Sequence, residues 1–254
     1  MTGVEVTRAN ENFQFAFEKA AEYAPDGAIA RFDPVTVTST GTDITSFNRI
    51  FTIGGRTPEA IEAAVEWMHD RGDPFWLTTT DERRAEVEAV ASSLDLVDAG
   101  VSQPGMVLRS LDGIPAPSSE ASIERVTDED DLEELVPVFA DVFDVPHDVT
   151  ETLIPPSVLD DATYELLVGR IDGRCVSCGT LLQRDGVAGV YSIATVEDHR
   201  GRGIGTDMTW EVLRAGRESG CQIGVLQSSE MGYPVYEKMG FEPVVDYHYF
   251  EPRT

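Results

Sequence analysis

The sequence predicts an α/β protein of two domains, each a mixed, mostly antiparallel twisted sheet flanked by helices. The chain has 254 residues, 41% of them hydrophobic, which is enough for one large core or two smaller ones. A run with two prolines, a glycine and two serines at residues 112–120 divides it near the middle. Element types alternate in a similar order on both sides of that run. We therefore expect a domain at 1–113, a linker at 114–121 and a second domain at 122–254.

In the first half, apolar residues at helical spacing predict a helix at Glu11–Ala24. Three short β-rich runs follow, at Ala28–Phe32, Val35–Thr40 and Ser46–Ile53. Thr57 and Pro58 predict the N-cap and first turn of a helix that stops at Gly72. The half is predicted to close with a strand, a helix and two strands, at Phe75–Thr79, Glu82–Leu94, around Val97–Val101 and around Met106–Leu111.

The second half is predicted to begin with a strand at Ser122–Val126 and a helix at Asp128–Phe143. Three strands follow a proline-rich stretch, at Tyr164–Ile171, Cys175–Gln183 and Val187–Val196. Asp172-Gly173 and Asp185-Gly186 separate them, and Asp-Gly is a strong hairpin signal. A helix, a strand, a short helix and a last strand are predicted at Ile204–Ser219, Gln222–Gln227, Gly232–Met239 and Glu242–Phe250. Both halves thus end in the same element order, which indicates a structural repeat.

The chain is strongly acidic, with 46 Asp and Glu against 19 Lys and Arg, a net charge of −27 and a pI near 4.3. Without clustered Lys or Arg, we expect neither nucleic acid nor an anionic membrane surface as a partner. Lys19 and Lys238 are the only lysines. An acidic, lysine-poor surface suits a protein that stays hydrated in molar salt, so the composition indicates a halophilic origin. An ordinary acidic cytosolic protein is the alternative.

Targeting signals are not visible in the sequence. The residues from Met1 to Glu5 have neither the basic nor the apolar region of a secretory signal, and no apolar run reaches the length of a membrane span. Three cysteines do not make a disulfide framework. We therefore expect a cytoplasmic protein, as a monomer or a homodimer.

The segment most informative about chemistry is Arg200-Gly201-Arg202-Gly203-Ile204-Gly205-Thr206, which follows a β-run and opens a helix. Free N–H groups at a helix N-terminus can hold a pyrophosphate, and glycines let the backbone approach it. A Walker A loop is excluded because no Gly-Lys-Ser/Thr occurs. A dinucleotide fingerprint is disfavoured because Thr206 replaces its third glycine and the preceding strands are hairpin-linked. A plain glycine-rich turn is the remaining alternative.

Two motifs together resemble the GNAT superfamily of acyl-CoA-dependent N-acetyltransferases. Arg200–Gly205 matches that family's Q/R-x-x-G-x-G/A signature, and Tyr236-Glu-Lys-Met-Gly-Phe241 is similar to its Tyr-Glu-Lys-Leu-Gly-Phe element. The motifs cover residues 190–241, and the element order extends the resemblance over about 120–254. The resemblance implies transfer of an acetyl group from acetyl-CoA, as co-substrate, to an amine by direct attack.

The resemblance also implies roles for individual residues. Backbone groups of Ile193 and Thr195 would pair with the pantetheine arm, and Tyr236 would act as general acid to the CoA thiolate. The CoA pyrophosphate would lie on the amides of Arg200, Gly201, Arg202, Gly203, Ile204, Gly205 and Thr206. Ser229 stands where the family often has Asn and can donate one hydrogen bond. An aromatic ring that packs a short helix onto the sheet is the alternative for Tyr236.

A general base for the amine and the identity of the acceptor are not readable. Five residues near the predicted site are candidate bases, namely Tyr191, Glu197, Asp198, His199 and Glu230, and a relay through water is the alternative. We expect the irregular segment 143–156 to line the acceptor groove. An acidic groove would suit a small-molecule or peptide amine, such as a polyamine, an aminoglycoside or an N-terminus.

The first half resembles a degenerate copy of the same fold. Gly54-Gly-Arg-Thr-Pro58 stands where the signature would be, without its pattern, and Pro58 removes a backbone donor. We expect no CoA there and a structural role for this half. Cys175 and Cys178 are three apart on a predicted strand and point to opposite faces, and the histidines lack metal spacing, so we expect no metal. The competing function is a catalytically inactive acyl-CoA-binding regulatory module.

Overall fold

The computed structural model describes residues 3–253, and the chain falls into two compact units. Unit 1 holds the chain up to residue 106 together with 227–231 and the part from 243 on. Unit 2 holds 107–226 and 232–242. The C-terminal part of the chain therefore contributes segments to both units. The sequence predicted a single division near the middle of the chain.

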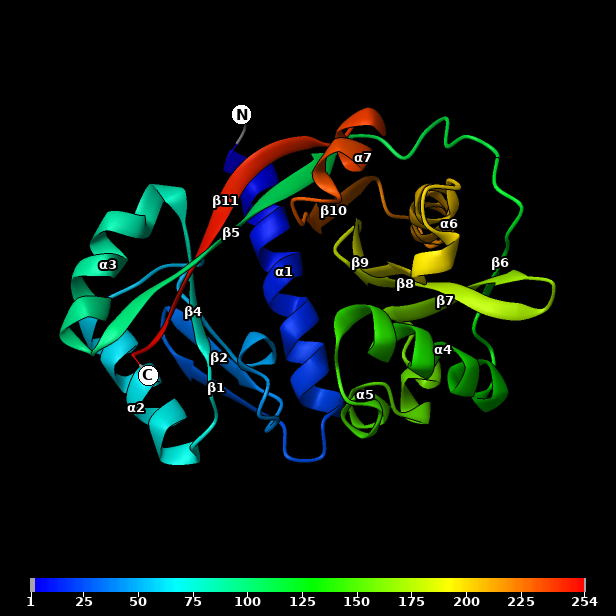
Figure 1. Cartoon of the computed structure of the whole chain (residues 1–254). Helices are drawn as coiled ribbons and strands as arrows, with labels where there is room; N and C mark the ends of the chain where they lie inside the picture. Colours follow the sequence, from blue (N-terminus) through cyan, green and yellow to red (C-terminus); the bar gives the residue numbers. More distant parts are fainter. Residues whose placement is uncertain (1–2, 254) are drawn as a thin grey trace. The chain divides into compact units, whose positions relative to one another are not determined.

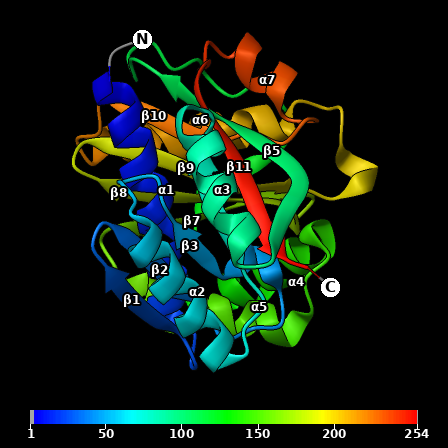
Figure 2. The same cartoon turned by 90° about the vertical axis from the view of Figure 1, so that its left-hand side faces the viewer.

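Unit 1 contains a sheet whose strands lie in the order β1-β2-β3-β4-β11-β5 (Figure 1). Its elements are α1 (Gly3–Tyr23), β1 (Ala28–Phe32), β2 (Val35–Ser39), η1 (Thr45–Phe47), β3 (Arg49–Phe51), α2 (Pro58–Arg71), β4 (Trp76–Thr80), η2 (Asp81–Arg83), α3 (Arg84–Ser93), β5 (Leu96–Leu108) and β11 (Glu242–Pro252). Strands β3 and β4 are parallel and are joined through α2. Helices α2 and α3 cover one face of this sheet and α1 covers the other (Figures 1 and 2).

The last strand completes unit 1 because its side chains fill that unit's core. Tyr247 of β11 pairs with Thr80 of β4 in an antiparallel register. Phe250 belongs to the same buried cluster as Ile50 and Leu77, under α2 and α3. On the opposite face, the ring of Tyr247 lies 4.7 Å from that of Phe13 on α1. Burial of these large side chains ties the C-terminal strand to the N-terminal half of the sequence.

Unit 2 contains strands in the order β10-β9-β8-β7-β6. Its elements are β6 (Ser122–Arg125), α4 (Glu129–Phe143), α5 (His147–Leu153), η3 (Pro156–Asp160), β7 (Tyr164–Ile171), β8 (Arg174–Arg184), β9 (Val187–Thr195), η4 (Glu197–His199), α6 (Ile204–Glu218), β10 (Ile223–Gln227) and α7 (Tyr233–Lys238). Strands β6, β7, β8 and β9 are antiparallel, and β9 and β10 are parallel. Helix α6 lies on one face of these strands and α4 on the other (Figure 1).

The two units repeat one arrangement. In unit 1 the parallel pair β3 and β4 is joined through α2, and in unit 2 the parallel pair β9 and β10 is joined through α6. Antiparallel registers join β1 to β2, β2 to β3 and β4 to β11 in unit 1, and β6 to β7, β7 to β8 and β8 to β9 in unit 2. The predicted fold class, mixed and mostly antiparallel sheets flanked by helices, is confirmed.

Local signals in the sequence predicted several turns and caps correctly. Asp172 and Gly173 have φ of 50° and 77°, and Asp185 and Gly186 have 50° and 75°, as the predicted Asp-Gly hairpin turns require. The Thr57 side chain accepts a hydrogen bond from an amide of α2, and that helix ends at a left-handed Gly72. Cys175 and Cys178 lie on β8, as predicted.

Four segments differ from the prediction. The first helix, predicted at Glu11–Ala24, begins at Gly3. Residues 46–53, predicted as one strand, form part of η1 and the short β3. Residues 97–111, predicted as two strands, contain one long strand, β5, that ends at Leu108, because the left-handed Gly100 and the Pro104-Gly105 pair are accommodated within it. Residues 143–156 were expected to be irregular but contain α5, whose first turn follows Pro146. None of these differences moves the predicted site residues to another element.

No helix among residues 3–253 has the length and apolar character needed to cross a bilayer.

The assignment of β11 to unit 1 can be tested by replacing Phe250 with Ala. Phe250 is 1% exposed, so the cavity should destabilise the protein by about 3–5 kcal/mol. Hydrogen exchange should show the earliest loss of protection in β3 and β4. Leu181→Ala on β8 is the control and should expose β7 to β9 instead. A Phe250→Ala protein that loses protection in β7 to β9 while β3 and β4 stay protected would contradict this assignment.

Candidate functional site

The predicted site begins where β9 parts from β10. These parallel strands are in register at only three pairs, from Ile223 opposite Val187 to Val225 opposite Gly189. Strand β9 continues to Thr195 and stays paired with β8 there, since Thr195 lies opposite Ser177. The backbone of β9 beyond Gly189 therefore has β8 on one side and no register partner in β10 on the other.

A bulge shapes this end of β9. Cys178 lies opposite Ala194 and Thr180 opposite Tyr191, so two residues of β9 face Gly179 alone. One of them, Ser192, has a φ of 53°, which marks the irregularity. A side chain at position 179 would come within 2.9 Å of the Ile193 side chain, so glycine permits the close packing that the bulge needs.

The glycine loop lies between η4 and α6, as predicted. Gly201 and Gly203 have φ of 75° and 84°, and a Cβ at either position would meet nothing within 4 Å. The first helical hydrogen bond of α6 runs from the Asp207 amide to the Gly203 oxygen, at 3.0 Å. Gly203 offers no side-chain cap, so the amides of residues 204–206 have no partner within the helix. These amides and the open space before them can receive an anion.

Both arginines of the loop contact groups of the protein. The Nε atom of Arg200 donates a hydrogen bond to the Thr195 carbonyl oxygen at 2.9 Å, which links the loop to the end of β9. Arg202 Nη1 lies 2.9 Å from a carboxylate oxygen of Glu120. Both arginines are exposed, so their guanidinium groups are accessible to an anion. An anion that binds them would compete with these two contacts.

Helix α2, the counterpart of α6 in unit 1, begins differently. Its N-cap is Thr57, whose hydroxyl accepts the Ala60 amide at 3.1 Å, and its first residue is Pro58, which has no N–H. Two of the three amides that are open in α6 are therefore missing or occupied in α2. The missing signature and Pro58 led us to expect no CoA in the first half, and the Thr57 cap agrees with that expectation, which stays a prediction.

Tyr236 lies on α7, the short helix predicted at 232–239, which begins at Tyr233 and has Pro234 in its first turn. The ring of Tyr236 packs edge-on against Phe241, with centroids 5.8 Å apart. Burial raises the pKa of the Tyr236 phenol above its ordinary value, and a side-chain hydrogen bond with Thr209 opposes this rise. Thr209 is fully buried on α6, where its hydroxyl donates to the Gly205 oxygen at 2.8 Å. Thr209 was not foreseen, because its position on a helix interior gives no sequence signal.

Ser229 and four of the five candidate bases lie on η4 or on the segment 227–231. Ser229 and Glu230 are exposed and belong to the 227–231 segment of unit 1. Glu197 and Asp198 are exposed on η4, directly before the glycine loop. His199 follows them, and its Nδ1 atom is buried without a hydrogen-bond partner.

Sequence reasoning missed a second set of contacts around α6. Asp207, in the first turn of α6, is 2% exposed and accepts hydrogen bonds from the amides of Ser118 and Ser119. In the sequence it resembles any acidic residue that suits a helix N-terminus. The predicted linker is therefore bound to the helix that follows the glycine loop.

Residues 131–241 match the family model described as the acetyltransferase (GNAT) family. This range contains β9, the glycine loop, α6 and Tyr236. The match covers less than half of the chain, so it is a similarity of this segment to GNAT acetyltransferases.

Two curated proteins are similar to part of the chain. An uncharacterized N-acetyltransferase, YobR, of Bacillus subtilis is 30% identical over 74 residues, which cover 28% of this chain and 30% of that protein. Glucosamine 6-phosphate N-acetyltransferase of Trypanosoma brucei brucei is 33% identical over 79 residues, which cover 29% of this chain and 52% of that protein. The chain thus spans about a third and about half of the lengths of these relatives.

The fold of the whole chain is similar to that of a GCN5-related N-acetyltransferase from Kribbella flavida. The TM-score is 0.73, and the match covers 100% of this chain and 97% of that one. The sequences are 15% identical, so the likeness is one of fold. It extends over both halves of the chain.

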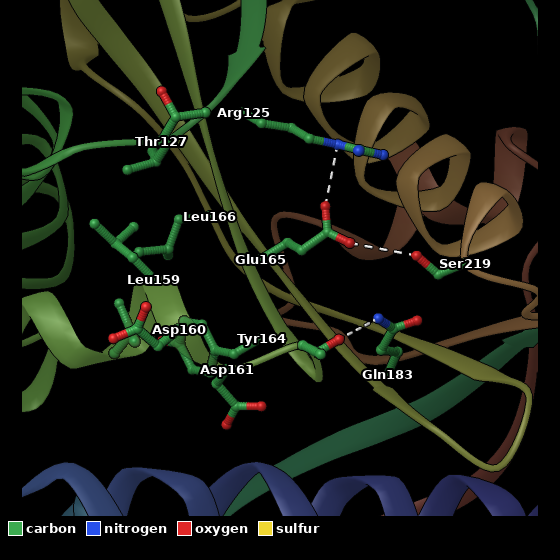
Figure 3. A pocket seen from close by; sticks show the side chains of 13 residues that line it. Arg125, Thr127, Leu159, Asp160, Asp161, Tyr164, Glu165, Leu166, Gln183 and Ser219 are labelled. Atoms are coloured by element: carbon green, nitrogen blue, oxygen red, sulfur yellow. Dashed lines mark hydrogen bonds and ion pairs between the residues drawn. The ribbon is translucent and has the colours of Figure 1, made fainter.

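A separate cavity of about 570 Å³ lies at the start of β7 in unit 2 (Figure 3). On its wall, the Glu165 carboxylate lies between Arg125, at 3.1 Å, and Ser219, at 3.4 Å. The start of β7 and the end of β8 adjoin the start of β9, whereas the glycine loop follows the end of β9. The described residues that line this cavity include none of the predicted site residues.

The packing of α6 on the strands of unit 2 can be tested by substituting two glycines of that helix. A Cβ at Gly216 would lie 2.6 Å from Ala188 Cβ on β9, so Gly216→Ala should destabilise the protein by about 1–3 kcal/mol. At Gly205 the nearest atom, Thr195 Oγ1, is 3.6 Å away. Gly205→Ala is the control and should be neutral or stabilising by up to about 1 kcal/mol. Urea unfolding in molar KCl measures both, and a Gly216→Ala protein as stable as the wild type would disprove the close approach.

Proposed function

We propose that unit 2 transfers an acetyl group from acetyl-CoA to an amine. The observation that carries this proposal is the pairing of two open features in unit 2. The backbone of β9 beyond Gly189 lacks a β10 partner, and the next helix begins with uncapped amides behind two left-handed glycines. An extended arm with amide groups fits the first feature, and a pyrophosphate fits the second. Acetyl-CoA carries both groups.

In this proposal the chain's own groups bind and orient the thioester. Backbone groups of Ile193 and Thr195 pair with the pantetheine arm, and the amides of residues 204–206 hold the pyrophosphate. The amine attacks the thioester carbonyl, the C–N bond forms, the C–S bond breaks, and a water relay takes up the proton that the nitrogen loses. The Tyr236 phenol, whose pKa is raised by burial, is protonated at neutral pH and gives its proton to the departing sulfur.

The acceptor in this proposal is an amine of a small molecule or a peptide. Support comes from the relative in Trypanosoma brucei brucei, whose name states that it acetylates glucosamine 6-phosphate. The structure supplies acidic groups on the segment 143–156, including Asp144, Asp148 and Glu151, all exposed. A cationic amine is compatible with them.

Cofactor binding is tested by calorimetric titration of acetyl-CoA in molar KCl, with Gly203→Glu as the variant. A glutamate there adds a negative charge and a Cβ at a φ of 84°, so saturable one-site binding should be lost. Gly220→Glu is the matched control, because Gly220 has a φ of 92° and open space at the other end of α6. It carries similar backbone strain and the same charge and should bind normally. Equal binding by both variants would place the cofactor elsewhere.

The chemical step is tested with Tyr236→Phe. Loss of the phenol proton should lower kcat by about 10²–10⁴-fold and leave the Kd for acetyl-CoA within about twofold of the wild type. Burial raises the pKa of the wild-type Tyr236 phenol above its ordinary value of 10.0. Deprotonation of Tyr236 should therefore not lower kcat at any pH below 10.0. Thiol release with a panel of amines measures the rate. Binding of acetyl-CoA without thiol release from any amine would instead favour the inactive binding module.

A further inference from the structure

Residues 112–120 lie along α6 and are bound there by side chains of that helix. Arg217, in the last turn, lies 3.8 Å from Asp112. One turn earlier, Arg214 Nη2 donates to the Pro115 carbonyl oxygen at 2.8 Å. The segment follows the helix from its C-terminal end toward the glycine loop, so it is a bound strap within unit 2 and not a free linker. We call residues 112–120 the strap.

Asp207 binds the end of the strap through two backbone amides. One carboxylate oxygen of this buried residue accepts the amides of Ser118, at 2.8 Å, and Ser119, at 2.5 Å. Burial alone would raise the pKa of Asp207, but the hydrogen bonds from Ser119 and Ser118 hold it below its ordinary value. The carboxylate is therefore charged at neutral pH, and charge-assisted hydrogen bonds of this kind are strong ones. The end of the strap is fixed against the first turn of α6.

The residue that follows Ser119, the last residue bound by Asp207, contacts the glycine loop. Glu120 follows Ser119 directly, and its carboxylate lies 2.9 Å from Arg202 Nη1. The hydrogen bonds of Asp207 to Ser118 and Ser119 thus hold the Glu120 carboxylate near Arg202, one of the two arginines of the loop. A carboxylate and a phosphate bind the same guanidinium donors, so they compete for Arg202.

We propose that Glu120 is a built-in competitor for the phosphate groups of the cofactor at Arg202, and that Asp207 is the positioning residue that holds it there. This rests on the proposed function, since it assumes that the loop receives the phosphates of acetyl-CoA. The cofactor must displace Glu120 to gain Arg202. The strap therefore lowers cofactor affinity.

The test compares Glu120→Gln with Glu124→Gln by titration of acetyl-CoA. Glu124 is an exposed neighbour that contacts Arg170, at 3.5 Å, and Ser122, so its loss removes the same charge without touching Arg202. Glu120→Gln should bind acetyl-CoA about two- to fivefold more tightly than the wild type, because the side chains of the ion pair are half-exposed. Glu124→Gln should bind like the wild type. The gain should shrink as KCl is raised, because salt screens the competing charge.

Three further measurements test whether Glu120 acts through Arg202 and is positioned by Asp207. In an Arg202→Gln background, Glu120→Gln should not change the affinity for acetyl-CoA, since the first substitution has already removed the ion pair. Acetyl-pantetheine, which lacks the phosphates, should bind wild type and Glu120→Gln equally. In ligand-free Asp207→Asn, the amides of Ser118 and Ser119 should exchange faster, and acetyl-CoA should bind about as tightly as to Glu120→Gln.

The outcomes separate this proposal from the proposed function. Equal affinity of Glu120→Gln and Glu124→Gln for acetyl-CoA would overturn the competition while leaving the cofactor site intact. If the folded wild type does not bind acetyl-CoA, the proposed function fails, and inorganic pyrophosphate is then titrated into the same variants. Tighter pyrophosphate binding by Glu120→Gln would support Glu120 as a competitor for anions at Arg202. No difference, or no pyrophosphate binding, would overturn it.

Discussion

The separation of β9 from β10 beyond the Gly189–Val225 pair is the constraint on which the rest of unit 2 depends. Strand β9 keeps its hydrogen bonds to β8 across a bulge, so its backbone stays extended while its other edge opens. The chain then turns through left-handed glycines into α6, which returns over β9 and packs closely on Ala188 through Gly216. An open strand edge and an open helix start thus come from one stretch of chain.

Comparison of the two units shows that the fold alone does not make this site. Both units contain a parallel pair joined through a helix, yet the helix starts differ. In α2 the Thr57 hydroxyl occupies one amide and Pro58 removes another, whereas Gly203 leaves the start of α6 uncapped. The same topology therefore supports a capped, structural helix in one unit and a candidate anion site in the other.

Most elements and the candidate loop could be predicted because their signals are local. Asp172-Gly173, Thr57-Pro58 and the Arg200–Gly205 motif each act through residues next to one another in sequence. The place of β11 could not be predicted, since its pairing with β4 and the burial of Phe250 depend on residues far away in the chain. The same holds for Asp207, whose partners lie 88 and 89 positions earlier. Alternating apolar patterns show that a strand is buried but not which sheet receives it.

In the proposed function, the start of α6 receives the cofactor and the start of α2 does not. Hydrogen exchange of the wild type with and without acetyl-CoA, in molar KCl, tests this most directly. We predict that the amides of residues 204–206 become protected on binding, together with residues 193–195 of β9, while those of residues 57–60 in α2 do not change. Protection at α2, or no change at residues 204–206 under saturating acetyl-CoA, would contradict the account.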